Sequence, residues 1–568
     1  MERASLDSIS SESVNKTASV RSGSNPSQPL LVPVFLICIA AFLVVAPFFY
    51  FGIPSGHDFE FHMNSWMETL AQWKQGVFYP RWAGLAHYGY GEARFLFYPP
   101  ASWMLGAALG AVMPWTWVSG AYTWIALSLS GISMFLLARR WLPCKQAVFA
   151  AIFYAANPYF LVVVYWRSAF AELLAGAFIP LIVWAIVRAE EGNRRVVIPL
   201  ALIVAAAWLT NVPSAVMVTY SVMFLVLVFA VFRRSPKMLA VGAAGIVLGG
   251  LLAAFYLVPA IYEQKWINIF QVVSEGLRPQ DNFLFANTSD NDHNIFNHLV
   301  SIVAISEILA LALVGFWTLG LKRIRSSSIT VITLWAGVIS ISMLPATIFF
   351  WNHLPELRYL QFPWRWLLCM NLPLAILAAQ SWKRFIPRVV LYIALLGVVV
   401  YVWHTILPPW WNKTADIIEM QDNQESGAGY EGTDEYVPRG GDSYDLQQDA
   451  PKIRYTGSGS ATFEVQRWDN ELKGFAANAT EPGQLVLRLF NYPAWQVTVN
   501  GRVTPVAPES DNAQMMIPVQ AGHSVVEIKF TRTWDRTAGA ILSALTVTFL
   551  IIMIFWQRGT HGKKVAHS

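Results

Sequence analysis

The run LLVPVFLICIAAFLVVAPFFYF, residues 30–51, is the stretch that decides the fold class of this chain. Its 22 residues carry no charge, and about 20 such residues suffice for a helix to cross a bilayer. The run is too long for the core of a signal peptide and has no clear cleavage site, so we interpret it as a retained membrane anchor. Shortly after it, GHDFEFHMNSW (residues 56–66) places two acidic and two histidine side chains at the expected membrane boundary.

The composition of the whole chain is that of a polytopic membrane protein. Of the 568 residues, 55% are hydrophobic and 13% are charged, whereas soluble domains average about 45–50% apolar and about 25% charged residues. Cys38, Cys144 and Cys369 lie in or beside apolar runs without the spacing of a metal site, which argues against a disulfide framework and a cysteine zinc site. Membrane lipids are therefore expected partners, and nucleic acid is not.

Apolar windows of about 20 residues predict a core of twelve membrane-spanning helices within residues 31–408 and 538–557. They are residues 31–51, 116–138, 146–165, 169–188, 196–211, 213–232, 238–261, 299–320, 328–350, 364–382, 388–408 and 538–557. A further apolar stretch, PPASWMLGAALGAVMP at residues 99–114, is short between its prolines. We expect it to form an interfacial or re-entrant helix rather than a span.

The positions of the basic residues support this assignment. If residues 99–114 do not cross, Lys16 and Arg21 of the N-terminal tail lie on the same side as every later basic cluster, and the positive-inside rule makes that side cytoplasmic. The clusters are Arg139-Arg140, Arg188 with Arg194-Arg195, Arg233-Arg234-Lys237, Lys322-Arg323-Arg325, Lys383-Arg384-Arg388 and Lys563-Lys564. A disordered tail at residues 1–30 and a short tail at 558–568 are thus both predicted to be cytoplasmic.

Three long segments are then expected on the opposite, outer side: residues 52–115, 262–298 and 409–537. The third reads as a β-rich domain, because GQLVLRLFNYPAWQVTVNGRVTPV and SVVEIKFTRT alternate apolar and polar residues. Asn500-Gly501 between two such runs predicts a two-residue hairpin turn. We expect an extracytoplasmic antiparallel β-sandwich.

The segment after Asp58 has the pattern of an amphipathic helix. Phe59, Met63 and Trp66 recur at helical spacing and form an apolar face suited to the membrane interface. Asp58 and His62 are four residues apart and share another face. Carboxylates at this boundary are costly unless they are hydrated, paired or used in chemistry. A solvated polar face and a functional carboxylate are both open interpretations.

Several motifs of the chain resemble a known family. GHDFEFH (56–62), YPRW (79–82), FLFYPP (95–100), RSAFAEL (167–173), LPELRYLQFPWRWL (354–367) and GYEGTDEYVP (429–438) are similar to those of bacterial membrane proteins called 6-pyruvoyl-tetrahydropterin synthase related. The order of an acidic residue after the first span, an interfacial helix, a Tyr-Pro-Pro stretch and a span ending in Arg-Arg also resembles the GT-C superfamily of glycosyltransferases. The resemblance covers nearly the whole chain. It implies an inverting enzyme that transfers a sugar from a polyprenyl-phosphate donor on the outer face of the bacterial inner membrane.

The resemblance also implies roles for the residues around Asp58. Asp58 matches the carboxylate that acts as general base in such enzymes, with His57 or His62 orienting it. If a metal is required, Asp58 and Glu60 are oxygen ligands suited to Mg²⁺ or Mn²⁺. The acceptor is expected to be an envelope glycan, lipid or protein.

A leaving phosphate requires cations on the outer side, and sugar recognition suits carboxylates with aromatic rings. Arg358 and Arg365 are favoured as phosphate contacts, with interfacial anchoring as the alternative for each. Arg167 and Glu172 are also candidate substrate-binding residues; the alternatives for Arg167 are snorkelling to lipid headgroups and an ion pair with Glu172. The remaining candidate substrate-binding residues are Arg81, Arg94, Glu263, Lys265, Gln361, Tyr430, Glu431 and Glu435. Glu263 and Lys265 could instead pair with each other, and the segment around Tyr430 could be a lid or a structural turn.

Two other classes of function compete with the enzyme. A transporter or flippase for lipid-linked saccharides requires ionisable groups near mid-membrane and broken helices, whereas these predicted spans are nearly free of charge. A non-catalytic envelope assembly protein would use the β-rich domain and would tolerate loss of Asp58.

Overall fold

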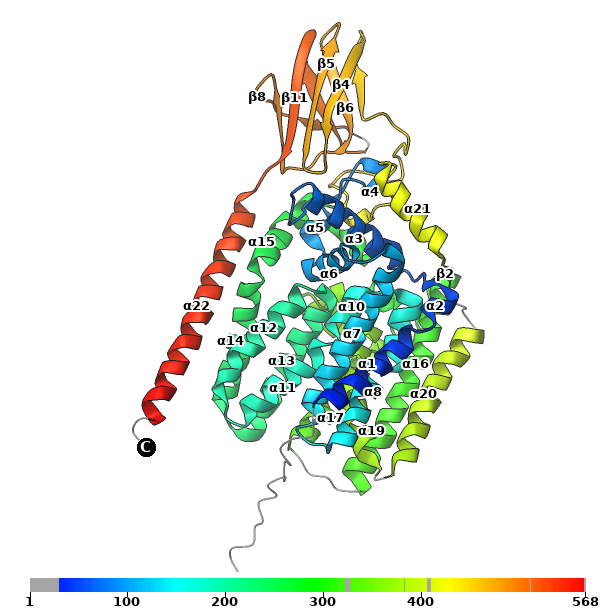
Figure 1. The fold of residues 1–568 in the computed structure, drawn as a ribbon, viewed down its shortest axis with the longest axis vertical. Helices are drawn as coiled ribbons and strands as arrows, with labels where there is room; N and C mark the ends of the chain where they lie inside the picture. Colours follow the sequence, from blue (N-terminus) through cyan, green and yellow to red (C-terminus); the bar gives the residue numbers. More distant parts are fainter. Residues whose placement is uncertain (1–29, 322–326, 383, 406–409, 511, 566–568) are drawn as a thin grey trace, which may run out of the picture.

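The computed structural model describes residues 30–321, 327–382, 384–405, 410–510 and 512–565. A bundle of apolar helices forms one end of the molecule and two β-sheets form the other, with short helices between them (Figure 1). The predicted N-terminal tail lies outside the described residues. So do Lys322, Arg323, Arg325 and Lys383 of the basic clusters.

Eight helical stretches in the described part of the chain are long and apolar enough to cross a membrane. They are Leu31–Phe51 (α1, Leu31–Val45, and α2, Phe48–Phe51), Trp115–Ala138 (α7), Cys144–Arg167 (α8, Cys144–Ala155; α9, Pro158–Val162; η1, Val163–Arg167), Phe170–Glu190 (α10, Phe170–Ala175; α11, Phe178–Glu190), Val212–Arg233 (α13), Asn291–Gly320 (α16, Asn291–Gly315, and part of η6, Phe316–Leu321), Phe385–Thr405 (α20) and Trp534–Phe555 (within α22, Trp534–Val565). These confirm a polytopic helical fold.

Two further predicted spans are bent rather than straight. The 238–261 segment contains α14 (Pro236–Leu252) and α15 (Ala254–Glu263), with a bend of 74°, and the 328–350 segment contains α17 (Ser327–Ser342) and α18 (Ile348–His353), with a bend of 96°. Counting each bent pair as one span gives up to ten. The two remaining predicted spans, 196–211 and 364–382, contain shorter helices, α12 (Val197–Trp208) and α19 (Leu367–Ser381).

Residues 99–114 form a short helix, α6 (Pro100–Gly110), which packs against α3 (Phe59–Lys74). The face of α3 that carries Phe59, Met63 and Trp66 is fully buried, and Trp66 stacks on Tyr122 of α7 at 4.9 Å between ring centroids. Gly106 of α6 allows this packing, because a Cβ there would lie 2.1 Å from the Trp66 ring. The apolar face of α3 is therefore covered by protein, which corrects the prediction that it faces the membrane interface.

The C-terminal segment forms two antiparallel sheets, with strand orders β3-β6-β10-β9 and β4-β5-β11-β7-β8. The strands are β3 (Ile453–Thr456), β4 (Ala461–Trp468), β5 (Leu472–Ala479), β6 (Gly483–Phe490), β7 (Trp495–Val499), β8 (Arg502–Val503), β9 (Ala507–Pro508), β10 (Gln514–Val519) and β11 (Gly522–Phe530). Asn500 and Gly501 have φ values of 53° and 76° and join β7 to β8, which confirms the predicted hairpin. A β-rich segment is thus confirmed.

Chain segments that are far apart in sequence meet between the helical bundle and the sheets. β1 (Ile53–Pro54) pairs with β2 (Trp411–Asn412), and isolated bridges join Ala86 to Tyr430 and Ile267 to Pro438. We call residues 52–115 the first loop. Its Trp82 and Tyr90 pack in the same buried cluster as the residues between the two sheets. The remaining short helices here are α4 (Ala86–Gly89), α5 (Arg94–Phe97) and α21 (Thr414–Glu425). The segments 52–115, 262–298 and 409–537 therefore form one continuous structure.

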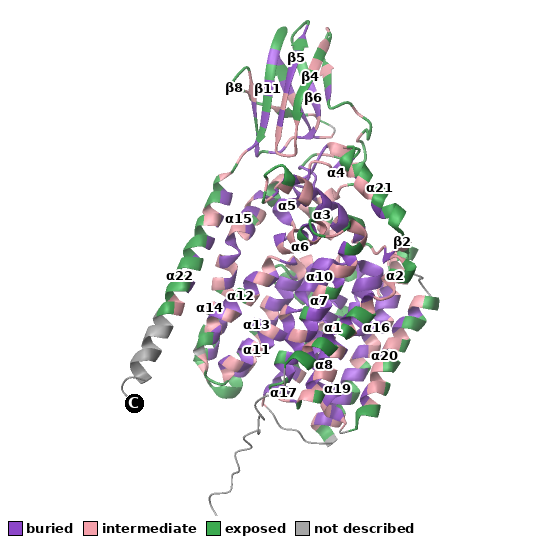
Figure 2. Ribbon diagram, viewed as in Figure 1, coloured by how far each residue is buried: buried purple, intermediate pink, exposed green. Residues whose placement is uncertain are grey.

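The helix α22 runs from the sheets along one side of the molecule and packs first against α15 and then against α14 (Figure 1). Most of its described side chains are exposed or half-buried (Figure 2), and only 17% of its most apolar window is buried. An exposed apolar helix of this length is stable where lipid covers it.

Candidate functional site

Asp58 lies directly before α3 and is held against the end of the π-helical turn η1. The backbone N–H of Asp58 donates to Arg167 O at 2.9 Å, and the N–H of Gly56 donates to the Ser168 hydroxyl at 3.0 Å. A Cβ at Gly56 would lie 2.4 Å from the carbonyl carbon of Arg167, so only glycine permits this approach. Ser168 itself has a φ of 49°, a left-handed conformation that ends η1. These contacts hold the backbone of residues 56–58 (GHD) against that of residues 166–168 (WRS).

A network of charged side chains extends from Asp58 into the protein. Arg167 Nη2 lies 3.7 Å from Asp58 Oδ2, and Arg167 Nη1 lies 2.5 Å from Glu172 Oε2. Glu172 also accepts from the hydroxyl of Tyr159 and lies 3.2 Å from Arg365 Nε. We call Asp58, Tyr159, Arg167, Glu172 and Arg365 the Asp58 site. The ion pair between Arg167 and Glu172, an alternative in the sequence analysis, is present.

Burial distinguishes Asp58 from the other members of the Asp58 site. The Asp58 side chain is 41% exposed, whereas that of Arg167 is 3% and that of Glu172 is 2% exposed. Two buried guanidinium groups therefore share one buried carboxylate, and the second carboxylate reaches solvent. Such an arrangement leaves one carboxylate accessible on a support of buried, paired charges.

Aromatic rings line the two arginines of the Asp58 site. The guanidinium of Arg167 lies 5.1 Å from the ring centroid of Trp364, and that of Arg365 lies 4.6 Å from that of Phe362. Phe362 and Trp364 are themselves stacked at 4.8 Å. These contacts hold the planar guanidinium groups in place. The stretch FPWRW (362–366) therefore positions charge in this structure, beyond the interfacial anchoring considered from the sequence.

Gln361 connects the Asp58 site to a neighbouring loop. Its amide oxygen accepts from Arg365 Nη1 at 3.1 Å, and its amide nitrogen donates to Val272 O at 2.8 Å. Val272 belongs to η4 (Ile269–Val273), which follows η3 (Gln264–Trp266). Through Gln361, the Asp58 site adjoins the loop formed by residues 264–274.

The other residues predicted beside Asp58 have different environments. The ring of His57 packs on Phe296, with 4.7 Å between centroids. His62 is 1% exposed and lies among aromatic rings such as Tyr98 and Phe170, where burial lowers its pKa to about 4. Its imidazole is therefore uncharged at neutral pH. Glu60 is exposed in the first turn of α3.

No group of three or more histidine, cysteine or acidic side chains that could hold a metal occurs among the described residues. Asp58 and Glu60 are therefore not part of a larger cluster of ligands in that portion of the chain. We assign no step of the chemistry to a metal.

Arg94 and Tyr430, both predicted substrate contacts, lie inside a buried cluster that joins the first loop to the C-terminal segment. Arg94 forms an ion pair with Glu92 and donates to Thr433 Oγ1 at 3.1 Å. Tyr430 donates to Glu68 Oε2 at 2.5 Å. We call Glu68, Glu92, Arg94, Tyr430 and Thr433 the junction cluster. Its side chains satisfy one another, so they hold two segments together.

Glu263, Lys265 and Arg81 are also placed by the structure. Glu263 forms two hydrogen bonds with Arg536 of α22, at 2.7 and 2.8 Å, so the alternative pairing of Glu263 with Lys265 is wrong. The ammonium of Lys265 lies 3.6 Å from the ring centroid of Tyr262. The backbone N–H of Arg81 donates to Glu471 between β4 and β5, at 2.9 Å. Glu263 and Arg81 therefore connect segments of the fold.

Arg358, Glu431 and Glu435 belong neither to the Asp58 site nor to the junction cluster. Arg358 is exposed and donates to the Tyr359 hydroxyl at 2.8 Å. Glu431 is exposed, whereas burial raises the pKa of Glu435, in the turn η10 (Asp434–Tyr436), to about 7. The structure therefore brings some candidates together in the Asp58 site and others in the junction cluster, and the remaining candidates lie apart from both.

A buried carboxylate that the sequence analysis passed over is Glu307, within α16. Its two oxygens accept from the backbone N–H of Tyr159 at 3.1 Å and from the side-chain amide of Asn371 at 2.9 Å. Glu307 is an acid in an otherwise apolar predicted span, 299–320, and that contrast was a usable signal. Tyr159 carried no comparable signal, because one of its two partners, Glu307, is 148 residues away.

Comparison with known proteins places the chain in a family. No curated protein matches the chain. Residues 95–409 match the family model for the 6-pyruvoyl-tetrahydropterin synthase related domain, described as a membrane protein. The match includes Arg167, Glu172 and Arg365 but not Asp58 or the β-rich segment. Because it spans more than half of the 568 residues, the chain belongs to the 6-pyruvoyl-tetrahydropterin synthase related family of membrane proteins.

Proposed function

We propose that this protein is a membrane glycosyltransferase that transfers a sugar from a polyprenyl-phosphate donor to a cell-envelope acceptor. The proposal includes the GT-C-like architecture with twelve crossings, both termini in the cytoplasm and the C-terminal sheets as a sandwich outside the bacterial inner membrane. The observation that carries it is the half-exposed carboxylate of Asp58, supported by the buried Arg167–Glu172–Arg365 network at the junction of bundle and outer segments.

In the proposed reaction, Asp58 accepts the proton of an acceptor hydroxyl while the hydroxyl oxygen bonds to the anomeric carbon of the donor sugar. The bond from that carbon to the phosphate oxygen breaks on the opposite face, and its electron pair leaves with the phosphate. Attack from the opposite face inverts the anomeric centre. Arg167, which lies 3.7 Å from Asp58 and has Arg365 behind it, orients the Asp58 carboxylate for this proton transfer.

A transporter is the second candidate, because Glu307 places an ionisable group inside a candidate span and two other candidate spans are bent. Both oxygens of Glu307 nevertheless have donors, one of them the backbone N–H of Tyr159 in the first turn of α9. A carboxylate that accepts from a backbone N–H in the first turn of a helix stabilises that helix, which gives Glu307 a structural role.

The variant Glu307→Gln separates the two candidates. An amide keeps the acceptor oxygen for one donor and cannot exchange a proton, so an enzyme with a structural Glu307 retains its glycan product. A proton-coupled transporter loses transport with the same variant. Complementation of a deletion strain, read by mass spectrometry of envelope glycans, measures the first outcome, and uptake into vesicles measures the second.

The test of the enzyme uses Asp58→Asn, which keeps the shape of the side chain and removes its basicity. We expect envelope glycan to disappear in cells, and transfer from a polyprenyl phosphosugar in membrane vesicles to fall about 10²- to 10⁴-fold, the usual contribution of a general base. Glu419→Gln, on the exposed side of α21, is the matched control. Equal product with Asp58→Asn at equal expression contradicts the proposal.

A further inference from the structure

A groove formed by the loop that Gln361 joins to the Asp58 site carries cations that the proposed reaction does not use. It has a volume of about 770 Å³ and is lined by residues of η3 and η4, by Arg358 and Tyr359, and by Arg439. Lys265, Arg358 and Arg439 are its charged side chains, and no acidic residue lines it. We call this recess the cationic groove.

The three cations of the cationic groove lack counter-charges in the protein. Among the described residues, no carboxylate lies within ion-pair distance of Lys265, Arg358 or Arg439. By contrast, the buried Arg94, Arg167, Arg365 and Arg536 each have a glutamate partner. Cations that line one recess without counter-charges favour a bound anion.

The cations are also held in position. Lys265 and Arg358 lie over the aromatic rings of Tyr262 and Tyr359, at 3.6 and 4.8 Å from the ring centroids. The backbone N–H of Arg439 donates to Trp266 O at 2.9 Å, beside the bridge that joins Ile267 to Pro438. The groove therefore combines two loops that the fold brings together.

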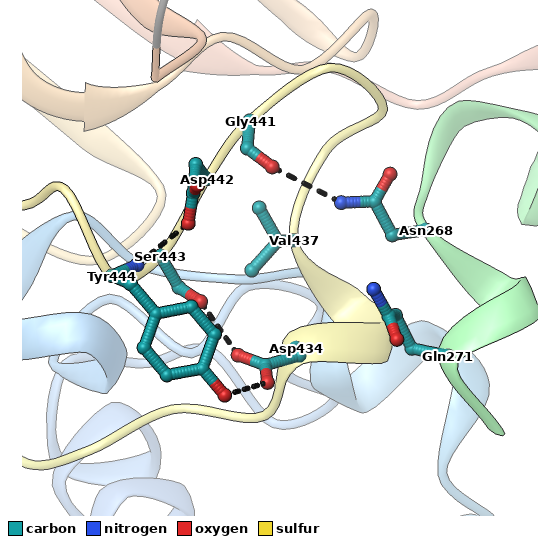
Figure 3. Close-up of a pocket in the computed structure, with 8 residues that line it drawn as sticks. All are labelled: Asn268, Gln271, Asp434, Val437, Gly441, Asp442, Ser443 and Tyr444. Carbon is teal, nitrogen blue, oxygen red and sulfur yellow. Dashed lines mark hydrogen bonds between the residues drawn. The ribbon is translucent and has the colours of Figure 1, made fainter. Parts of the chain in front are cut away.

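A second, polar recess adjoins the cationic groove, and Asn268 and Gln271 line both (Figure 3). It has a volume of about 300 Å³. Asp434 accepts from the hydroxyls of Ser443 at 2.6 Å and Tyr444 at 2.9 Å, and this carboxylate fixes the position of the tyrosine. The ring of Tyr444 is 84% exposed. We call this recess the tyrosine pocket.

We propose that the cationic groove and the tyrosine pocket together bind one saccharide that carries a phosphate group. Lys265, Arg358 and Arg439 take the phosphate through charge-assisted hydrogen bonds. The amides of Asn268 and Gln271 and the carboxylate of Asp442 suit sugar hydroxyls, and the apolar face of a pyranose packs on the exposed Tyr444 ring.

The assignment of this saccharide as the acceptor rests on the proposed function, whereas its binding does not. Gln361 links the loop that forms the groove to Arg365 of the Asp58 site, so the two regions are joined by a short chain of hydrogen bonds. Two kinds of molecule carry a saccharide with a phosphate group: a soluble sugar phosphate and a phosphosugar anchored in the membrane.

Binding to the full-length protein in nanodiscs tests the proposal. The soluble probe is glucose 1-phosphate, with glucose and inorganic phosphate as its separate components, and the membrane probe is a polyprenyl phosphoglucose incorporated into the nanodisc. We expect glucose 1-phosphate to bind more tightly than either component. Binding of the soluble probe identifies a free source, and binding of the membrane probe alone identifies a lipid-anchored one; absence of both overturns the proposal.

The variants assign the binding to these residues. The triple variant Lys265→Gln, Arg358→Gln, Arg439→Gln should lower affinity about tenfold or more. Tyr444→Ala should weaken binding of glucose 1-phosphate but leave inorganic phosphate unchanged. The matched control is Lys452→Gln, Arg502→Gln, Lys529→Gln, which removes three exposed cations from the β-rich segment. Equal loss in the control, or wild-type affinity in the groove variant, overturns the proposal.

Folding and function remain separable in this design. If the triple variant does not fold, Arg439→Gln alone tests the groove, because its exposed side chain has no described side-chain partner. Binding that persists while Asp58→Asn retains transfer contradicts the proposed function and leaves the site. Loss of transfer in Asp58→Asn without any specific binding contradicts the site and leaves the function.

Discussion

At the scale of single residues, exposure to solvent distinguishes Asp58, the acid proposed to react, from the acids that stabilise the fold. Asp58 reaches solvent, whereas Glu68, Glu92, Glu172 and Glu263 are buried with donors around them. A buried carboxylate is tolerated only when hydrogen bonds or counter-charges replace its water. Partner and exposure, rather than residue type, therefore decide which acids hold the fold and which one is available to a substrate.

Removal of the carboxylate that two arginines share should destabilise the protein strongly. Glu172→Ala leaves the guanidinium groups of Arg167 and Arg365 buried without their common partner. Breaking a buried pair in this way costs about 3–5 kcal/mol, which thermal unfolding in detergent detects as a lower Tm. Glu191→Ala breaks the exposed pair with Arg140 and should cost no more than about 1 kcal/mol. Similar Tm values for both variants would contradict the network.

Glu68 should make stability depend on pH. Burial raises its pKa to about 7, even though Tyr430 and backbone N–H groups donate to it. An acid with a raised folded-state pKa binds its proton more tightly in the folded protein, so stability falls as pH rises from about 4.5 to about 7. We expect Tm to drop over this interval. Glu68→Gln should make the curve flatter, and an unchanged slope would exclude Glu68 as its cause.

At the scale of elements, two short pieces of chain determine where Asp58 lies. The π-helical turn η1 and the start of α3 are joined by backbone hydrogen bonds and by the contact at Gly56. The contact depends on the irregular π-helical turn η1 and not on a regular α-helix of the bundle. Helix irregularities of this kind are frequent at functional sites.

Gly56→Ala tests this arrangement. A Cβ at this position would lie 2.4 Å from the backbone of Arg167, so the start of α3 must move away from η1 and carry Asp58 with it. We expect transfer activity to fall about a hundredfold, the order of loss produced by a displacement of about 1 Å, with a small change in Tm. The control is Gly250→Ala in α14, where no atom lies within 4 Å of the added methyl. Full activity in Gly56→Ala would remove the requirement for close contact.

At the scale of the whole molecule, the first loop, the loop after α15 and the β-rich segment form one body over the helical bundle (Figure 1). Arg536, Tyr492 and Glu263 tie the start of α22 to the end of α15. The junction cluster ties the first loop to the segment before the sheets. Asp58 comes from the first loop, whereas the cationic groove is lined by the loop after α15, by Arg358 and Tyr359, and by Arg439 of the segment before the sheets.

A cysteine pair tests whether the first loop and the sheets meet. A Cβ at Gly84 would lie 3.4 Å from Asn470 Cα, within reach of a disulfide between Gly84→Cys and Asn470→Cys. With Cys38, Cys144 and Cys369 replaced by alanine, we expect nearly complete cross-linking under mild oxidation, detected by peptide mass spectrometry. Gly84→Cys with Ser458→Cys is the control. Labelling of the two positions from opposite sides of the membrane would exclude the arrangement.

The sequence by itself determined the elements that depend on local or one-dimensional patterns. A helix in lipid must satisfy its backbone internally and present apolar side chains over its length, so the anchor at residues 31–51 and most other spans were visible as runs. Asn500-Gly501 required no partner from elsewhere, because two left-handed residues specify the hairpin. Asp58 was found in the same way, as an acid directly after a span.

Tertiary structure alone decided the partners of the charges and the shape of the recesses. Arg94 bonds Thr433, 339 residues away, and Glu263 bonds Arg536, 273 residues away; no local pattern encodes such a choice. The bends of 74° and 96° likewise break apolar runs that hydropathy reads as straight spans. The physical reason is that hydrophobicity is a property of each residue, whereas the pairing of a buried charge depends on which distant segment folding brings within hydrogen-bond distance.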